Sequence, residues 1–128
     1  MSALRVGVVG AGGKVGREVC EAVSQASDLE LVARIDLGDS LDQLTSNGAE
    51  AIVDFTHPDA VMDTLNFCVT HGIDAVVGTT GFDEGRLAQL RTWLGAAPTS
   101  GVLIAPNFSI GAILMMDFAA RAAAFYES

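Results

Sequence analysis

The 128-residue chain is poor in positive charge, in cysteine and in long apolar runs. Seven Lys and Arg stand against sixteen Asp and Glu, which gives a net charge of −9. Since binding to nucleic-acid phosphates requires clustered Lys and Arg, nucleic acid is not an expected partner. No stretch has the ~20 consecutive apolar residues of a membrane-spanning helix, and the N-terminus lacks the pattern of a secretory signal. We therefore expect a soluble, cytoplasmic protein with no membrane partner.

Cysteine is limited to Cys20 and Cys68, which lie far apart in apolar segments. They form no Cys-x-x-Cys pair and belong to no closely spaced set of zinc ligands. The sequence therefore predicts neither a metal site nor a redox pair, and both thiols are expected to be buried and reduced. With three prolines and half of its residues apolar, the chain has the size and composition of one compact domain.

Short apolar runs alternate with helical patterns along the chain. Five runs are brief and rich in β-branched residues, as strands buried on both faces should be: residues 4–9, 29–35, 51–53, 74–77 and 101–105. Helices are predicted to begin near residue 15, at Pro58, after Asp83 and after Ser109, while residues 39–48 form either one short helical turn or a loop. The pattern predicts an α/β fold, a Rossmann-like open parallel sheet of about five strands with helices on both faces.

Glycine is concentrated at the end of the first strand. The segment "GVVGAGGKVGRE", residues 7–18, contains five glycines and the single lysine of the chain, Lys14. Gly10, Gly13 and Gly16 follow a strand and open a helix in a G-x-x-G-x-x-G spacing. A pyrophosphate needs bare backbone N–H groups and gains from the positive end of a helix dipole. This turn therefore predicts a nucleotide-phosphate site.

Asp36 follows the second strand, twenty residues beyond the last glycine of the turn. A carboxylate at this point accepts hydrogen bonds from the adenosine ribose hydroxyls, which favours NADH. The next residue is Leu37 and not a base, yet Lys14, Arg17 and Arg34 could reach a 2′-phosphate, so NADPH stays open. The alternative for Asp36 is a solvated turn residue at a strand end.

The remaining strand ends supply further candidates. Asp54 in "DFTHP" is expected to hold loop N–H groups, because no partner histidine is evident for general-base work. His57 is interpreted as a helix-entry residue and His71 as a cation at a helix C-terminus. Two segments fit the walls of a nicotinamide pocket: Gly78-Thr79-Thr80-Gly81 and Ala105-Pro106-Asn107-Phe108-Ser109. The alternative for these segments is tight turns and a serine helix cap.

Four segments taken together, "GAGGKVGRE", "VDFTHP", "FCVTHGIDAVVGTTGFDE" and "IAPNFSIGA", resemble the amino-terminal half of the 4-hydroxy-tetrahydrodipicolinate reductase family, also called dihydrodipicolinate reductase, of bacterial lysine and diaminopimelate synthesis. The resemblance runs in order across nearly the whole chain. It implies an oxidoreductase that uses NADH or NADPH for hydride transfer to a cyclic unsaturated dicarboxylate. It also implies cofactor contacts from Gly10, Ala11, Gly12, Gly13, Lys14 and Val15 to the pyrophosphate, from Asp36 to the ribose, and from Gly78, Thr79, Thr80, Ala105, Pro106, Asn107 and Phe108 to the nicotinamide.

The sequence departs from the family in what it lacks. Family members continue into a second domain with a His-His pair, a nearby lysine and a Ser-Gly-Thr turn, which bind the substrate and donate the proton, and this domain assembles a homotetramer. None of these motifs occurs here, so we assign no catalytic residue and interpret residues 1–128 as one dinucleotide-binding domain without the second. We expect these residues alone to bind NADH weakly, to lack reductase activity and not to form the tetramer. Two alternatives stay open: a non-catalytic dinucleotide sensor, and a domain for another adenosine ligand, such as S-adenosylmethionine or a nucleotide-sugar.

Overall fold

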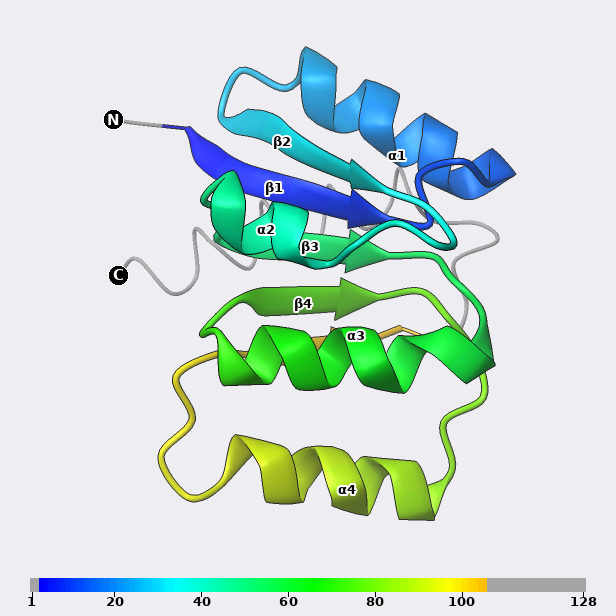
Figure 1. Cartoon of the computed structure of the whole chain (residues 1–128), viewed down its shortest axis with the longest axis vertical. Coiled ribbons are helices and arrows are strands. Elements are labelled where there is room, and N and C mark those ends of the chain that lie inside the picture. The colour runs from blue at the N-terminus through cyan, green and yellow to red at the C-terminus, as the bar shows by residue number, and fades with distance from the viewer. Residues whose placement is uncertain (1–2, 106–128) are drawn as a thin grey trace.

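The computed structural model describes residues 3–105, which form a five-stranded parallel sheet with its helices in the connections (Figure 1). The strands lie in the order β2-β1-β3-β4-β5. Along the chain the elements are β1 (Leu4–Val9), α1 (Lys14–Gln25), β2 (Leu29–Ile35), α2 (Asp42–Ser46), β3 (Ala51–Asp54), α3 (Pro58–Thr70), β4 (Asp74–Val77), α4 (Glu84–Leu94) and β5 (Val102–Ile104). The predicted fold class is confirmed. The helix predicted after Ser109 lies outside the described residues.

Strand β1, between β2 and β3 in the sheet, contributes to two apolar clusters, because its successive side chains point to opposite faces of the sheet. On one face Val6 and Val8 pack with buried residues of α1: Val19, Cys20 and Val23. On the other face Val9 belongs to a larger cluster with residues of β2, β3, β4, α2, α3 and α4. Helices therefore cover both faces, as the sequence predicted.

The segment 39–48, which the sequence left open, contains the short helix α2. Its Leu44 is fully buried in the larger cluster. A Cβ atom on Gly7 of β1 would overlap the Leu44 side chain, so the glycine in the strand makes room for this leucine. Burial of one apolar side chain, rather than a long periodic pattern, explains why the helix forms here.

Local signals start the two longer helices on the larger cluster's face. Pro58 occupies the first turn of α3, where the missing N–H costs nothing, and His57 Nδ1 accepts a hydrogen bond from Asp59 N at 3.2 Å. Asp83 Oδ1 accepts from Arg86 N at 2.8 Å at the start of α4. The helix α1 differs, because its N-cap is Gly13 and no side chain caps its first turn.

All five strands run parallel, so their carboxyl ends meet at one edge of the sheet (Figure 1). Backbone hydrogen bonds hold the loops together there: Gly10 N donates to Ile35 O at 2.7 Å, Phe55 N to Val9 O at 2.9 Å and Gly78 N to Asp54 O at 2.8 Å. The chain goes from β1 to β2 on one side and later crosses to β3 on the other. Ligands of open α/β sheets bind at such a reversal of strand order.

Candidate functional site

The glycine turn after β1 is shaped by two close backbone approaches. Gly10 has a φ of +88°, and a Cβ atom there would lie 2.7 Å from the Phe55 carbonyl carbon and closer still to its oxygen. A Cβ atom on Gly16 would overlap the Gly10 carbonyl oxygen. These two glycines are therefore needed for the turn to pack against the loop after β3 and for α1 to begin behind it.

Gly13 is different, because the protein itself leaves room for a side chain there. Its φ is −74°, and an added Cβ atom would lie 3.5 Å from Gly10 O, which is an ordinary contact distance. The neighbouring Lys14 is exposed, and the first turn of α1 contains no acidic residue. The start of α1 thus presents bare backbone, the positive end of the helix dipole and one cation on the same surface.

A cleft of about 330 Å³ joins this turn to the loops after β3 and β4. We call it the turn cleft. Its lining residues come from three strand ends: Gly13, Lys14, Val15, Gly16, Phe55, Thr56, Pro58, Gly78, Thr79 and Thr80. The structure therefore brings together two groups of sequence-predicted residues, at the glycine turn and at positions 78–80. Ala105 is close to the second group, since its N–H donates to Val77 O at 2.9 Å.

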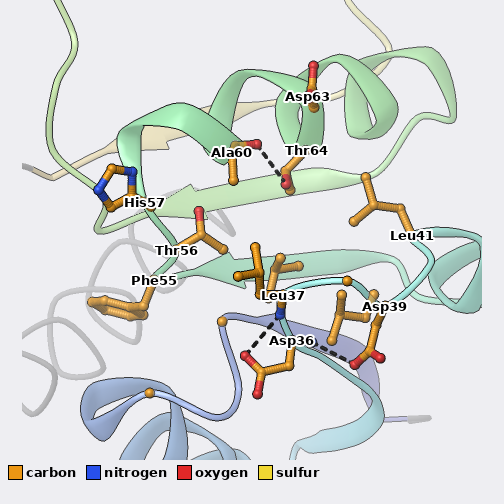
Figure 2. Close-up of a pocket in the computed structure, with 15 residues that line it drawn as sticks. Asp36, Leu37, Asp39, Leu41, Phe55, Thr56, His57, Ala60, Asp63 and Thr64 are labelled. Carbon is orange, nitrogen blue, oxygen red and sulfur yellow. Dashed lines mark hydrogen bonds between the residues drawn. The ribbon is translucent and has the colours of Figure 1, made fainter.

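A second cavity, also of about 330 Å³, lies beside Asp36 and is shown in Figure 2. In this Asp36 cavity, apolar side chains of Val9, Ile35 and Leu41 accompany polar groups from the loops after β2 and β3. Neither lysine nor arginine is among its lining residues, whereas Asp36, Asp39 and Asp63 are. Such a lining suits an uncharged ring and hydroxyl donors better than a phosphate.

The Asp36 carboxylate is exposed and lies over the glycine turn (Figure 2). Its Oδ1 accepts a hydrogen bond from Leu37 N at 3.1 Å, and an added Cβ atom on Gly12 would overlap its Oδ2. Asp39 Oδ2 accepts from Asp36 N at 2.9 Å. The sequence analysis missed Asp39, although its place three residues after Asp36 in a glycine-containing turn is a usable signal.

A third cavity, of about 300 Å³, lies on the α1 side of the turn and contains two arginines. We call it the arginine cavity; its lining residues are Ala11, Arg17, Cys20, Glu21, Ser24 and Arg34. The ion pairs found among residues 3–105 join Arg5 to Glu50 and His57 to Asp59, so neither arginine of this cavity has a carboxylate partner there. Arg34 lies in β2, two residues before Asp36.

Asp54 ends β3 as a fully buried carboxylate. Its Oδ1 accepts hydrogen bonds from Thr79 Oγ1 at 2.5 Å, Thr56 Oγ1 at 2.9 Å and Thr56 N at 3.1 Å. The expectation that Asp54 holds a loop N–H is confirmed. Burial raises the pKa of Asp54 above its ordinary value, and the hydrogen bonds from Thr79 and Thr56 oppose this shift only in part. The Thr79 hydroxyl thus donates to Asp54, a contact that no sequence pattern indicates.

The remaining polar candidates have the structural roles that the sequence predicted. His57 lies at the entry to α3 and His71 at its C-terminus, where His71 Nδ1 is 2.7 Å from Phe67 O. Cys20 and Cys68 are buried and unpaired. Burial raises the pKa of Cys20, and burial together with the nearby Asp54 charge raises that of Cys68 to about 12.

Three findings concern only the part of the chain between residues 3 and 105. No three His, Cys, Asp or Glu side chains gather there as metal ligands. No helix in this part has the length and apolar character to cross a membrane. Of the predicted nicotinamide contacts, Pro106, Asn107 and Phe108 lie outside it.

The parallel sheet has a bare glycine turn at its first strand–helix junction, an acidic residue directly after β2 and a cleft at the reversal of strand order. These features together define a Rossmann-like dinucleotide-binding domain. The chain belongs to the family described as dihydrodipicolinate reductase, N-terminus, whose model matches residues 4–108.

Three known proteins illustrate the similarity. The chain is 62% identical over 125 residues to the 4-hydroxy-tetrahydrodipicolinate reductase of Nocardia farcinica, covering 98% of this chain and 50% of that protein. It is 59% identical over 128 residues to the Streptomyces griseus protein of the same name, covering 100% and 51%. The solved structure of dipicolinate-bound dihydrodipicolinate reductase from Paenisporosarcina sp. TG-14 matches with a TM-score of 0.69 at 29% identity, over 96% of this chain and 54% of that one. The chain therefore spans about half the length of the curated relatives it matches.

Proposed function

We propose that this chain binds a nicotinamide dinucleotide and serves as the cofactor domain of a 4-hydroxy-tetrahydrodipicolinate reductase. In the intact protein the reaction is hydride transfer to a cyclic unsaturated dicarboxylate. Relatives at 59–62% identity that carry this name support the activity. The proposal depends on one observation at Gly13. The packing of the described residues does not require glycine at this position, and the position lies where a pyrophosphate would approach the start of α1.

The three strand-end sites divide the dinucleotide between them. The pyrophosphate lies on the backbone of residues 10–15 with Lys14 beside it, and the adenosine ribose donates to Asp36. The adenine ring fits the Asp36 cavity, whose apolar walls and acidic rim suit an uncharged ring with amino donors. Residues 78–80 and Ala105 would hold the nicotinamide at the turn cleft, and Pro106, Asn107 and Phe108, outside the described residues, are proposed as further contacts.

The bound nicotinamide supplies the hydride, and the residues of this chain hold and orient it. Lys14 and the uncapped start of α1 bind the anionic pyrophosphate, while the backbone after β4 approaches the ring. The groups that hold the dicarboxylate and protonate it are proposed to lie in the half of the relatives that this chain does not span. On this account, residues 1–128 alone bind the dinucleotide without turning over substrate.

We further propose that the domain accepts both NADH and NADPH. The Asp36 carboxylate favours the free ribose hydroxyls of NADH. The arginine cavity lies on the other side of the same turn, with Arg34 two residues from Asp36. A 2′-phosphate there would meet two guanidinium groups that have no carboxylate partner among residues 3–105. The Glu21 carboxylate also lines this cavity and repels an anion, so we do not expect strong selection of NADPH over NADH.

Gly13→Ala in the intact protein tests the binding site. Gly85→Ala is its matched control, since Gly85 lies in the first turn of α4 and an added Cβ atom there would be 3.4 Å from Asp83 Oδ1. Loss of one charge-assisted hydrogen bond, worth about 1.5–3 kcal/mol, predicts NADH binding weakened by roughly 10- to 100-fold in Gly13→Ala. If calorimetry gives equal NADH dissociation constants for the two variants, the glycine turn is not part of the binding site.

The competing function is a dinucleotide sensor that needs no second domain. It predicts that residues 1–128 bind NADH as tightly as the intact protein does. The reductase proposal predicts weaker binding by the isolated chain and turnover only in the intact protein. Comparing the two dissociation constants separates the alternatives.

A further inference from the structure

Asp54 connects two loops whose threonines, Thr56 and Thr79, lie 23 residues apart in the sequence. Its Oδ1 accepts from Thr56 N and Thr56 Oγ1 in the loop after β3, and from Thr79 Oγ1 in the loop after β4. Thr56 N also lies 2.9 Å from Thr79 Oγ1, so the Thr79 hydroxyl accepts from one loop while it donates to Asp54. These contacts form a closed network, the Asp54–Thr56–Thr79 network, in which each polar group fixes the other two.

The two loops of this network line the turn cleft, whereas Asp54 itself does not. Thr56, Gly78, Thr79 and Thr80 line the cleft together with the start of α1. Because Thr56 and Thr79 are hydrogen-bonded to each other, the network holds this part of the cleft lining in one arrangement. Asp54 therefore acts on whatever occupies the cleft through Thr56 and Thr79, without touching it.

A carboxylate at this position is costly to the fold. Asp54 is fully buried, and its Oδ2 has no hydrogen-bond partner among the described residues. An asparagine would offer a similar acceptor without burying a charge, so stability alone does not explain an aspartate here. What the carboxylate adds is strength, because hydrogen bonds to a charged acceptor are roughly twice as strong as those between neutral groups.

We propose that Asp54 is a positioning residue for the nicotinamide end of the dinucleotide: through Oδ1 it fixes the loops of residues 55–57 and 78–80 at the spacing that the ring requires. This inference rests on the proposed function. The adenosine end lies outside its reach, because Asp54 and Thr79 do not line the Asp36 cavity, although Thr56 borders both spaces.

Thr79→Val and Thr79→Ser in the intact protein separate positioning from general stability. Valine matches the shape of threonine and removes the hydroxyl, while serine keeps the hydroxyl. The ligands are NADH and ADP-ribose, which shares the adenosine and pyrophosphate but lacks the nicotinamide ring. We expect Thr79→Val to weaken NADH about tenfold and ADP-ribose less than about twofold, since one charge-assisted hydrogen bond is lost at the nicotinamide end only. Thr79→Ser keeps the hydrogen bond to Asp54, so it should lose clearly less NADH affinity than Thr79→Val.

Asp54→Asn supplies a second variant if Thr79→Val does not fold. It keeps an acceptor oxygen, so we expect NADH to weaken by a smaller factor, again with ADP-ribose unchanged. Leu90→Ala, which removes buried apolar atoms from α4 away from the cleft, is the control for loss of stability and should change neither affinity.

Three outcomes can be told apart. A selective loss of NADH affinity supports the positioning role. Equal weakening of NADH and ADP-ribose, or no change in either, overturns it and leaves Asp54 a purely structural residue. Failure of the wild-type protein to bind either ligand would instead contradict the proposed function itself.

Discussion

Replacing Gly10 by alanine should destabilise the domain far more than the same change at Gly38. Both glycines have nearly the same backbone conformation, with φ of +88° and +89°. An alanine in this left-handed region costs about 1–2 kcal/mol at either position. At Gly38 no atom of residues 3–105 beyond its chain neighbours lies within 4 Å of the added Cβ atom, so backbone strain is the expected effect there.

At Gly10 the added methyl group also meets the backbone of the neighbouring loop. Its Cβ atom would lie 2.7 Å from Phe55 C and 3.2 Å from Thr56 N, and a β-strand end cannot move aside as a flexible side chain can. Overpacking of this kind costs about 1–3 kcal/mol, so the total for Gly10→Ala is roughly 2–5 kcal/mol.

Urea denaturation, followed by the fluorescence of Trp93, the single tryptophan of this sequence, measures both losses from the shift of the midpoint at constant slope. Gly13→Ala belongs in the same series and should stay within about 0.5 kcal/mol of wild type, as surface substitutions without a steric conflict do. If Gly10→Ala and Gly38→Ala lose the same stability, the close approach of the turn to the loop after β3 is not what requires glycine at position 10.

Four further predictions concern single side chains. Asp36→Ala should weaken the binding of NADH, and Arg34→Gln should weaken the binding of NADPH while leaving that of NADH unchanged. Unaltered dissociation constants would show that these residues do not contact the dinucleotide. The Cys68 thiol, with its pKa raised to about 12, should resist iodoacetamide at pH 8 in the folded protein and react after unfolding, as peptide mapping can establish. Burial raises the folded-state pKa of Asp54 above the unfolded value of about 4, so protonation of this carboxyl favours the folded state. The free energy of unfolding of wild type should therefore increase, relative to Asp54→Asn, as the pH falls from 7 through the folded-state pKa towards 4. This gain should be lost as the pH rises. A stability difference that stays constant over this range would contradict that sign.

Much of the fold was predictable because its signals are local. The apolar run of β1 and the helix starts at Pro58 and Asp83 each depend on only a few neighbouring residues. Strands that alternate with helices along the chain predict a parallel sheet. The helix α2 was not predictable in this way. Its five residues are too few for a periodic pattern, and it exists because Leu44 fills the space that Gly7 leaves in the strand beneath it.

In the candidate site, too, some features follow from local sequence and others from the tertiary structure. The sequence by itself determined which residue types stand at each strand end, since parallel strands bring their carboxyl ends to one edge. Only the tertiary structure decided how those residues pair across the edge: the Thr79 hydroxyl turns to Asp54, and the two arginines share a cavity beside Asp36. Sequence also cannot say which glycines the fold needs. Gly10 is required by the Phe55 backbone, which approaches from another strand end, and Gly16 by the Gly10 carbonyl, whereas a Cβ atom on Gly13 would make only an ordinary contact of 3.5 Å with Gly10 O. That difference depends on distances between segments that no local pattern records.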